Sequence, residues 1–250
     1  MKLNVIECMD CLDYLKTLPD DSVDLVVTDP PYNVSQKSDL KFKGLKVKKN
    51  FGSWDFGFDP VPVMKELKRV LKPKGQIFVF CATKQIPVYM DIFEKDWFFR
   101  NLLVWNKTNP APRLSKTNFV FANEYIVYAI NDKQTKPGQV TSNWQGHTEM
   151  CNTLMTSALQ GKERLKEFGK TAHPTQKPLS ILKKLIKIAS NEGDIVLDFF
   201  MGVGSTAHAC IETGRNYLGC ELDKKYCDLA NRRLEKAKEK ENELNILQNS

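Results

Sequence analysis

The chain has 250 residues, the size of one large α/β domain that can bury a substantial core. Hydrophobic residues make up 42% and charged residues 27% of it, as in ordinary globular proteins. No apolar run approaches the roughly 20 residues that a membrane-spanning helix needs. Residues 1–6 also lack the apolar core and cleavage site of a secretory signal. We therefore expect a cytosolic protein without a membrane partner.

The seven cysteines are odd in number and scattered through predicted strands and helices, which argues against a disulfide framework. Cys8 and Cys11 have the spacing of a metal-binding pair. A zinc site needs four ligands, however, and no second pair of cysteines or histidines lies nearby in the sequence. We expect buried or half-buried thiols and no metal. The formal net charge of +7 favours a polyanionic partner, because Lys and Arg gain affinity by displacing counterions from phosphates.

Strand-like and helix-like segments alternate along the chain in two blocks. Residues 23–28 (VDLVVT) form an apolar, β-branched run, which is typical of a strand buried on both faces of a parallel sheet. The predicted strands are residues 3–8, 23–28, 76–81, 102–105, 125–130, 194–198 and 216–221. The predicted helices are residues 9–18, 62–71, 86–93, 179–190, 205–212 and 226 to about 240, with fraying over 242–250. We expect Pro73-Lys74-Gly75 to end the second helix.

This alternation predicts an α/β fold with a doubly wound, mostly parallel sheet, as one domain over residues 1–250. Ligands of such sheets bind at the carboxyl ends of the strands, where the winding reverses. Polar stretches over residues 33–53 and 132–172 interrupt the pattern. An insert of this length without periodicity is usually functional.

A glycine-rich turn, residues 198–206 (DFFMGVGST), follows a predicted strand and opens a helix. Gly202 and Gly204 let the backbone approach a ligand closely, and the helix N-terminus offers unpaired N–H groups to an anion. Glu221 ends the next strand, where a carboxylate typically binds ribose hydroxyls. The arrangement indicates a nucleoside cofactor without separating NAD from S-adenosylmethionine, although the third glycine of the dinucleotide fingerprint is absent. An ordinary tight turn with a solvated Glu221 is the alternative.

The tetrapeptide Asp29-Pro30-Pro31-Tyr32 ends the buried strand 23–28. Prolines cannot donate to a strand ladder and they restrict their predecessor, so the chain forms a rigid extended corner. Such a corner suits the activation of an exocyclic amino group, whose lone pair is delocalised into the base. The Asp29 carboxylate and the Pro30 carbonyl would accept its protons and free the lone pair, while Tyr32 would stack on the base, contributing about 1–3 kcal/mol. A structural turn with an exposed Asp29 is the alternative.

These residues resemble the motifs of the amino-methyltransferases. The tetrapeptide is similar to their catalytic motif, Asp/Asn/Ser-Pro-Pro-Tyr/Phe. The glycine turn resembles their cofactor motif, Asp-Pro-Phe-x-Gly-x-Gly-Thr-Thr, with departures at Phe199, Ser205 and Ala207. Residues 7–12 (ECMDCL) and 173–178 (HPTQKP) resemble two further motifs, although the second would also serve as a helix cap. The catalytic motif precedes the glycine turn, and this permuted order is that of the β-group of DNA adenine-N6 and cytosine-N4 methyltransferases.

The resemblance implies a Rossmann-like, S-adenosylmethionine-dependent methyltransferase that acts on N6 of an adenine flipped out of double-stranded DNA. Asp rather than Ser at position 29 favours adenine over cytosine. It implies the catalytic residues Asp29, Pro30, Pro31 and Tyr32. It assigns Asp10 to the adenine amino group of the cofactor, Glu221 to its ribose, and Thr175 and Lys177 to its carboxylate. The predicted cofactor-binding residues are Asp10, Cys11, Asp29, Thr175, Gln176, Lys177, Phe200, Gly202, Gly204, Ser205, Thr206 and Glu221.

Flipping a base costs on the order of a few kcal/mol, which contacts to the DNA backbone must offset. Residues 33–53 are rich in lysine and follow the catalytic corner directly, so we predict a DNA-contacting flap; a solvated loop is the alternative. The predicted DNA-binding residues are Lys37, Lys41, Lys43, Lys46, Lys48, Lys49, Lys107 and Arg113. Residues 132–172 occupy the place of the family's target-recognition region. Its candidate base readers are Asn143, Gln145, His147, Arg164 and Lys166.

Three other functions remain open on the sequence. The substrate base could be cytosine at N4, or lie in RNA. A catalytically silent DNA-binding or specificity subunit could share the fold. The third alternative is a nucleotide-dependent oxidoreductase, but that function would not explain the Pro-Pro corner. As partners, the resemblance suggests double-stranded DNA, a second copy of the chain in a homodimer, and a cognate restriction endonuclease.

Overall fold

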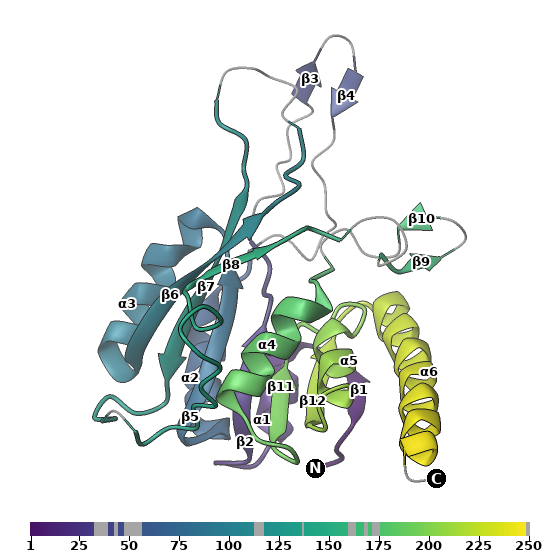
Figure 1. Cartoon of the computed structure of the whole chain (residues 1–250). Coiled ribbons are helices and arrows are strands. Elements are labelled where there is room, and N and C mark those ends of the chain that lie inside the picture. Colours follow the sequence, from purple (N-terminus) through teal and green to yellow (C-terminus); the bar gives the residue numbers. More distant parts are fainter. Residues whose placement is uncertain are drawn as a thin grey trace.

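An eight-stranded sheet with helices on both faces forms the body of the protein (Figure 1). The computed structural model describes residues 1–32, 40–42, 45–47, 57–112, 118–136, 138–159, 164–167, 170–171 and 176–248. In sheet order the strands are β1 (Val5–Cys8), β12 (Asn216–Glu221), β11 (Ile195–Asp198), β2 (Val23–Thr28), β5 (Leu71–Cys81), β7 (Asn123–Ile130), β6 (Phe98–Lys107) and β8 (Thr153–Thr156). β7 is antiparallel to both its neighbours, and the other pairs are parallel. The predicted doubly wound, mostly parallel α/β sheet is confirmed.

Three helices cover each face of this sheet (Figure 1). One layer contains α1 (Cys11–Thr17), α2 (Pro60–Val70) and α3 (Ile86–Asp96), and the other contains α4 (Leu179–Ala189), α5 (Ser205–Ile211) and α6 (Lys224–Gln248). Successive side chains of a strand point to opposite faces. In β2, Val26 therefore packs in the first layer while Leu25 and Val27 pack in the second. This two-sided burial is why β2 is apolar at nearly every position.

The winding of the sheet reverses between β2 and β11. From β2 the chain proceeds outward through β5 to β8, and it then returns through α4 to place β11 on the other side of β2. Leu25 pairs with Val196 and Val26 with Leu197 in the parallel register. The carboxyl ends of the two strands therefore lie side by side, and they carry the tetrapeptide and the glycine-rich turn.

Several predicted boundaries were wrong. Pro73-Lys74-Gly75 does follow α2, but it lies within β5, which begins at Leu71; Lys74 has a φ of 65° and the register with β2 shifts there. α6 continues to Gln248, where we expected fraying from residue 242. The described residues of the polar stretches include strands that the sequence did not predict. Within 33–53 these are the antiparallel strands β3 (Leu40–Phe42) and β4 (Leu45–Val47). Within 132–172 they are β8 and the short antiparallel pair β9 (Lys166–Glu167) and β10 (Lys170–Thr171).

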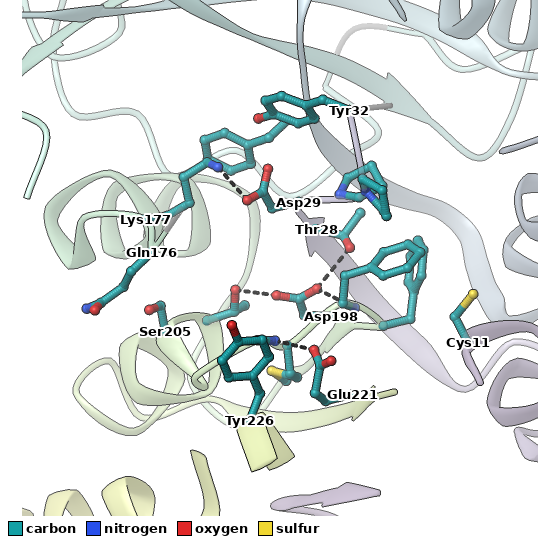
Figure 2. Close-up of a pocket in the computed structure, with 18 of the residues that line it drawn as sticks. Cys11, Thr28, Asp29, Tyr32, Gln176, Lys177, Asp198, Ser205, Glu221 and Tyr226 are labelled. Atoms are coloured by element: carbon teal, nitrogen blue, oxygen red, sulfur yellow. Dashed lines mark hydrogen bonds and ion pairs between the residues drawn. The ribbon is translucent and has the colours of Figure 1, made fainter. Parts of the chain in front are cut away.

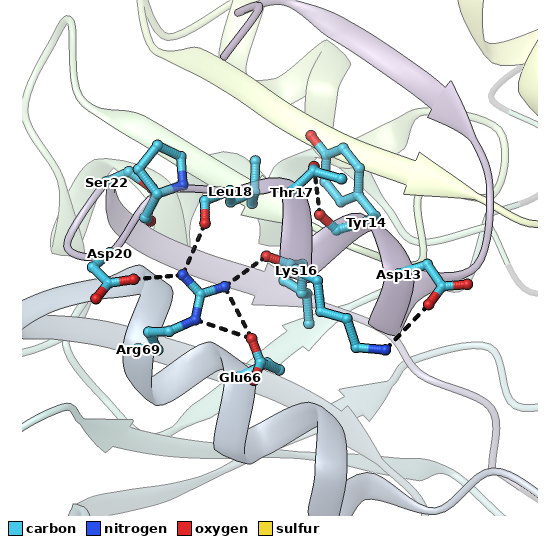
Figure 3. A network of polar contacts seen from close by, with 11 residues as sticks. Asp13, Tyr14, Lys16, Thr17, Leu18, Asp20, Ser22, Glu66 and Arg69 are labelled. Carbon is cyan, nitrogen blue, oxygen red and sulfur yellow. Dashed lines mark hydrogen bonds and ion pairs between the residues drawn. The ribbon is translucent and has the colours of Figure 1, made fainter.

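Arg69 of α2 connects this helix to the carboxyl end of the neighbouring helix α1 (Figure 3). The last carbonyl groups of a helix have no partner within the helix. The Arg69 guanidinium donates to the carbonyls of Leu15 and Leu18 at 3.0 and 2.8 Å, and it pairs with Asp20 and Glu66. One side chain thus satisfies the carboxyl end of α1 and fixes the two helices relative to each other. In the described part of the chain, no helix is both long and apolar enough to cross a bilayer.

The buried Asp198 connects three segments at the point where the winding of the sheet reverses. Its buried carboxylate accepts hydrogen bonds from the Thr28 hydroxyl at 2.9 Å, the Phe200 amide at 3.0 Å and the Thr206 hydroxyl at 2.6 Å (Figure 2). These donors belong to β2, to the turn after β11 and to α5. Burial nevertheless raises the pKa of Asp198 to about 6, and the three hydrogen bonds only partly oppose it.

We expect Asp198→Asn to stabilise the fold above pH 6. The folded-state pKa of about 6 exceeds the ordinary value of 3.8, so the ionised carboxylate destabilises the folded state at high pH and loses that penalty as the pH falls through 6. The amide retains an oxygen for Thr28 and Phe200, and the Thr206 hydroxyl can accept from its NH₂ group. The free energy of unfolding, from urea denaturation, should rise at pH 8 by on the order of 1–3 kcal/mol. The gain should vanish near pH 4, and a lower unfolding free energy at pH 8 would contradict the account.

Candidate active site

A cavity of about 800 Å³ opens at the carboxyl ends of β2 and β11 (Figure 2). It brings together predicted residues that are far apart in the sequence. The lining includes the predicted residues Asp10, Cys11, Asp29, Pro30, Pro31, Tyr32, Lys107, Gln176, Lys177, Phe200, Gly202, Ser205, Thr206 and Glu221. It also includes residues that the sequence did not single out, among them Phe58, Phe80, Trp105, Glu124, Leu159 and Tyr226.

The Asp29–Tyr32 corner leaves β2 and lines the middle of this cavity. Gln85 donates a hydrogen bond to the Pro31 carbonyl at 2.9 Å, which holds the corner against the segment after β5. Asp29 Oδ2 pairs with the ammonium of Lys177, whereas Asp29 Oδ1 is buried and has no hydrogen-bond partner among the described residues. Burial raises the pKa of Asp29, and the charge of Lys177 opposes that effect. One oxygen of the carboxylate is thus fixed and the other is available to a ligand.

Lys177 lies between the half-buried carboxylates of Asp29 and Glu124. Only 6% of its side chain is exposed, and its ammonium is 3.4 Å from Glu124 as well as paired with Asp29. It also lies 5.3 Å from the ring centroids of Tyr32 and Phe80. Burial lowers the pKa of Lys177, but its two carboxylate partners outweigh this and raise it. The predicted contact with the cofactor carboxylate stays a prediction, and the partners found in the structure are Asp29 and Glu124.

Glu124 of β7 joins the aromatic ring of the corner to this charge cluster. It accepts a hydrogen bond from the Tyr32 hydroxyl at 3.1 Å and pairs with both Lys107 and Lys177. Burial raises its pKa, but the two lysines outweigh burial, so the pKa of Glu124 is lowered. The sequence offered a weak signal for this residue, namely an acidic position directly before the apolar run of residues 125–130.

Lys107 is the one predicted DNA-binding residue whose side chain the structure describes, and it points into the cavity. Its ammonium pairs with Glu124 and lies 5.0 Å from the centroid of the Trp105 ring. Only 20% of the side chain is exposed. A lysine committed to a buried carboxylate is poorly placed to reach a DNA phosphate. Lys107 is thus a member of the cavity wall, and its predicted contact with DNA stays a prediction.

The glycine-rich turn and Glu221 form the other end of the cavity. Gly202 has a φ of 52° and donates its N–H to Glu221 at 2.8 Å, and the second Glu221 oxygen accepts from Asp223 at 2.9 Å. Burial raises the pKa of Glu221. Phe58 and Phe200 meet edge to face there, with ring centroids 5.1 Å apart. The turn thus combines acceptor oxygens with an aromatic wall.

Two predicted cofactor-binding residues have a structural use in the fold. Gly204 does not line the cavity; it starts α5 with a φ of 76°, and an added Cβ would lie 3.2 Å from Ala230 of α6. The absence of a side chain here therefore serves helix packing, and the predicted cofactor contact of Gly204 stays a prediction. Asp10 lines the cavity, but one of its oxygens caps α1 by accepting from the amides of Leu12 and Asp13.

The first half of the predicted recognition insert lies at the opposite end of the sheet. Asn143 donates to the carbonyls of Lys187 and Ser190 at 2.9 and 2.8 Å, so it caps the carboxyl end of α4. That end of α4 is next to the start of β11, away from Asp29. Asn143 thus has a structural use at α4, and the neighbouring Trp144 and His147 pack edge to face. The base-reading roles of Asn143 and His147 stay predictions. Among the described residues of the insert, those that line the cavity follow β8, and Arg164 is one of them.

Several predictions fall outside the described residues. They concern Lys37, Lys43, Lys48, Lys49, Arg113 and Thr175. Lys41 and Lys46 belong to β3 and β4, and Lys166 to β9, but their side chains are not described. The roles of these residues stay predictions.

Comparisons with known proteins agree with this geometry. The chain matches the DNA methylase family N6_N4_Mtase over residues 23–232. It is 36% identical over 266 residues to the Type II methyltransferase M.HinfI of Haemophilus influenzae, covering 98% of this chain and 72% of that protein. It is 30% identical over 239 residues to the Type II methyltransferase M2.DpnII of Streptococcus pneumoniae, covering 90% and 87%.

A solved structure shows the same arrangement of the chain. The crystal structure of the M1.HpyAVI–SAM complex aligns with a TM-score of 0.66 and 26% identity, over 92% of this chain and 98% of that one. A family match over most of the chain, relatives of this similarity and the cavity at the reversal point all agree. The chain belongs to the DNA methylase family of N6 and N4 amino-methyltransferases.

Proposed function

We propose that this protein transfers the methyl group of S-adenosylmethionine to N6 of an adenine in double-stranded DNA. The observation that carries the proposal is the state of Asp29. Its Oδ2 is held by Lys177, and its Oδ1 is buried without a hydrogen-bond partner among the described residues. A buried acceptor without a donor costs free energy. The amino group of a base that enters the cavity would supply the missing donor.

The corner around Asp29 explains how the amino group becomes reactive. Hydrogen bonds from N6 to Asp29 and to the Pro30 carbonyl favour a pyramidal nitrogen and localise its lone pair. The Tyr32 ring lines the same cavity and gives the base a surface on which to stack. S-adenosylmethionine, when bound, supplies a methyl group on a positively charged sulfur. Holding the nitrogen in line with that methyl group then accounts for most of the rate, by orientation and preorganised charge.

The donor and acceptor groups at the other end of the cavity suit this cofactor. Glu221 retains acceptor capacity beyond its two backbone partners, so it can bind the ribose hydroxyls. Phe58 and Phe200 offer an apolar wall to a purine ring. Asp10 is exposed at the rim, where one carboxylate oxygen can accept from the adenine amino group. We assign the amino-acid portion to the turn from Phe200 to Thr206 and to the segment with Thr175, Gln176 and Lys177.

The DNA would lie over the mouth of the cavity, with the target adenine flipped into it. The lysine-rich residues 33–53 directly follow Tyr32, which supports their role as a phosphate-contacting flap. Asp at position 29 favours adenine over cytosine, as in the adenine-N6 members of the family. Both curated relatives are named Type II methyltransferases, and this supports the prediction of a cognate restriction endonuclease. Homodimerisation is proposed from the family resemblance.

The decisive experiment is to identify the methylated base. Purified protein is incubated with radiolabelled S-adenosylmethionine and mixed genomic DNA, and the DNA is digested to nucleosides and separated. We expect label in N6-methyladenine. Label in N4-methylcytosine would keep the fold and the chemistry but overturn the base, and label in RNA alone would overturn the substrate. Cofactor binding without any transfer would favour a catalytically silent subunit.

Asp29→Ala should abolish methyl transfer while sparing the cofactor. Removing the carboxylate leaves the amino group without its main acceptor and leaves Lys177 with Glu124 as its one carboxylate partner in the described structure. We expect kcat to fall by at least about 10³-fold, with the Kd for S-adenosylmethionine within threefold of the wild-type value, by analogy with groups that act in the transition state. Single-turnover kinetics and equilibrium dialysis measure the two quantities. Wild-type turnover on saturating DNA would show that the assigned chemistry is wrong.

Glu221→Ala should have the opposite pattern. The carboxylate contacts the turn and the proposed ribose position, and it is remote from the methyl acceptor. We expect the Kd for S-adenosylmethionine to rise roughly 10- to 100-fold, the cost of about one or two charge-assisted hydrogen bonds. At saturating cofactor, kcat should recover to within a few-fold of wild type. Glu221→Gln, which retains one acceptor oxygen, provides the matched control and should lie between the two.

A further inference from the structure

Four charged side chains from four separate segments meet beside Tyr32. Asp29 follows β2, Lys107 ends β6, Glu124 lies in β7 and Lys177 precedes α4. Each of these side chains is at most 21% exposed. Their formal charges sum to zero, and Glu124 is the member that contacts both lysines and the Tyr32 hydroxyl.

Stability alone does not explain Glu124. Burying a charge is costly, and well-packed apolar residues often replace a buried ion pair at no loss of stability. Tyr125, Ile126 and Val127, which follow Glu124 in β7, are aromatic or β-branched, so an apolar residue would suit this part of the strand. A glutamate here therefore points to a role in the cavity itself.

The contacts of Glu124 show what that role is. Its Oε2 accepts from the Tyr32 hydroxyl at 3.1 Å, which fixes the far end of the ring, while the Lys177 ammonium lies 5.3 Å from the centre of that ring. The Tyr32 ring is thus fixed through its hydroxyl group, and the Lys177 ammonium lies over one of its faces. Glu124 also draws Lys177 to a point between two carboxylates, where it pairs with Asp29 Oδ2 and leaves Oδ1 open.

We propose that Glu124 is a positioning residue for methyl transfer. It holds the ring on which the target base stacks, and it shares Lys177 with Asp29 so that one defined oxygen of Asp29 meets the amino group. Lys107 pairs with the other carboxylate oxygen of Glu124, Oε1, and so helps to keep the carboxylate ionised where little of it is exposed. The inference rests on the proposed methyltransferase function and adds a residue that touches neither the reacting atoms nor the cofactor.

The same geometry makes the rate sensitive to pH through Glu124. The titratable or charged groups around Asp29 are Lys177, Glu124, Tyr32, Cys81 and Asp198, with Lys107 behind Glu124. The negative charge of Glu124 raises the pKa of Asp29, against the opposing charge of Lys177. Since the carboxylate is the active form of Asp29, removing the charge of Glu124 should move the acid limb of the rate profile to lower pH.

Two substitutions separate the ring contact from the charge. Glu124→Gln can still accept a hydrogen bond from Tyr32 but has no charge, and Glu124→Ala removes both. We expect Glu124→Ala to lower kcat by about 10²-fold, with the Kd for S-adenosylmethionine within twofold of wild type. Glu124→Gln should retain more activity and show the acid limb at lower pH. Glu66→Gln, which weakens an ion pair with Arg69 outside the cavity, is the control and should change neither quantity.

Each outcome decides the proposal. Wild-type kcat and an unmoved pH profile in both Glu124 variants, while the wild-type protein methylates DNA, would overturn the role of Glu124 alone. If Glu124→Ala does not fold, Glu124→Gln decides, because a purely structural residue would leave the acid limb in place. A wild-type protein that transfers no methyl group to DNA would overturn the proposed function, and this inference with it.

Discussion

The pairing of β2 with β11 is the constraint on which the rest of the site depends. It brings residue 29 beside residue 198, across most of the chain, and the Thr28–Asp198 hydrogen bond of 2.9 Å closes the contact at the strand ends. The reversal of winding leaves a crevice at this edge of the sheet, because the crossover helices pass to opposite faces. The rigid corner after β2 and the glycine turn after β11 therefore face the same cavity. The corner suits the acceptor of the transferred group, and the turn suits its donor.

Burying carboxylates at this edge of the sheet costs free energy, and the protein offsets that cost in different ways. Asp198 accepts three hydrogen bonds, from Thr28, Phe200 and Thr206, and so joins segments of the fold. Glu221 receives two backbone N–H groups and stays accessible at the cavity wall. Asp29 and Glu124 instead share Lys177, and Glu124 also pairs with Lys107. Removing one partner of such a buried pair typically costs about 3–5 kcal/mol, so the members of the cluster constrain one another's identity.

The parts of the molecule that the sequence predicts well are those determined by local chemistry. The apolar run of β2, the Pro-Pro corner and the glycine turn each specify their own conformation, and Val23–Thr28 and Asn216–Glu221 were predicted with their observed bounds. Glu124 was missed because its importance arises from Lys107, Lys177 and Tyr32, which only the folded sheet brings near it. The packing role of Gly204 was missed for the same reason, because its neighbour Ala230 in α6 is distant in the sequence.

The insert of residues 132–172 shows how an aperiodic segment can hold a helix of the fold in place. Asn143 caps the carboxyl end of α4, and Glu149 pairs with Lys184 further along that helix at 2.9 Å. Lys177 immediately precedes the amino end of α4, inside the cavity. A segment that anchors α4 at its far end therefore also restrains the position from which Lys177 reaches Asp29. The capping of α4 by Asn143 therefore explains part of the polar composition of the insert without any contact with DNA.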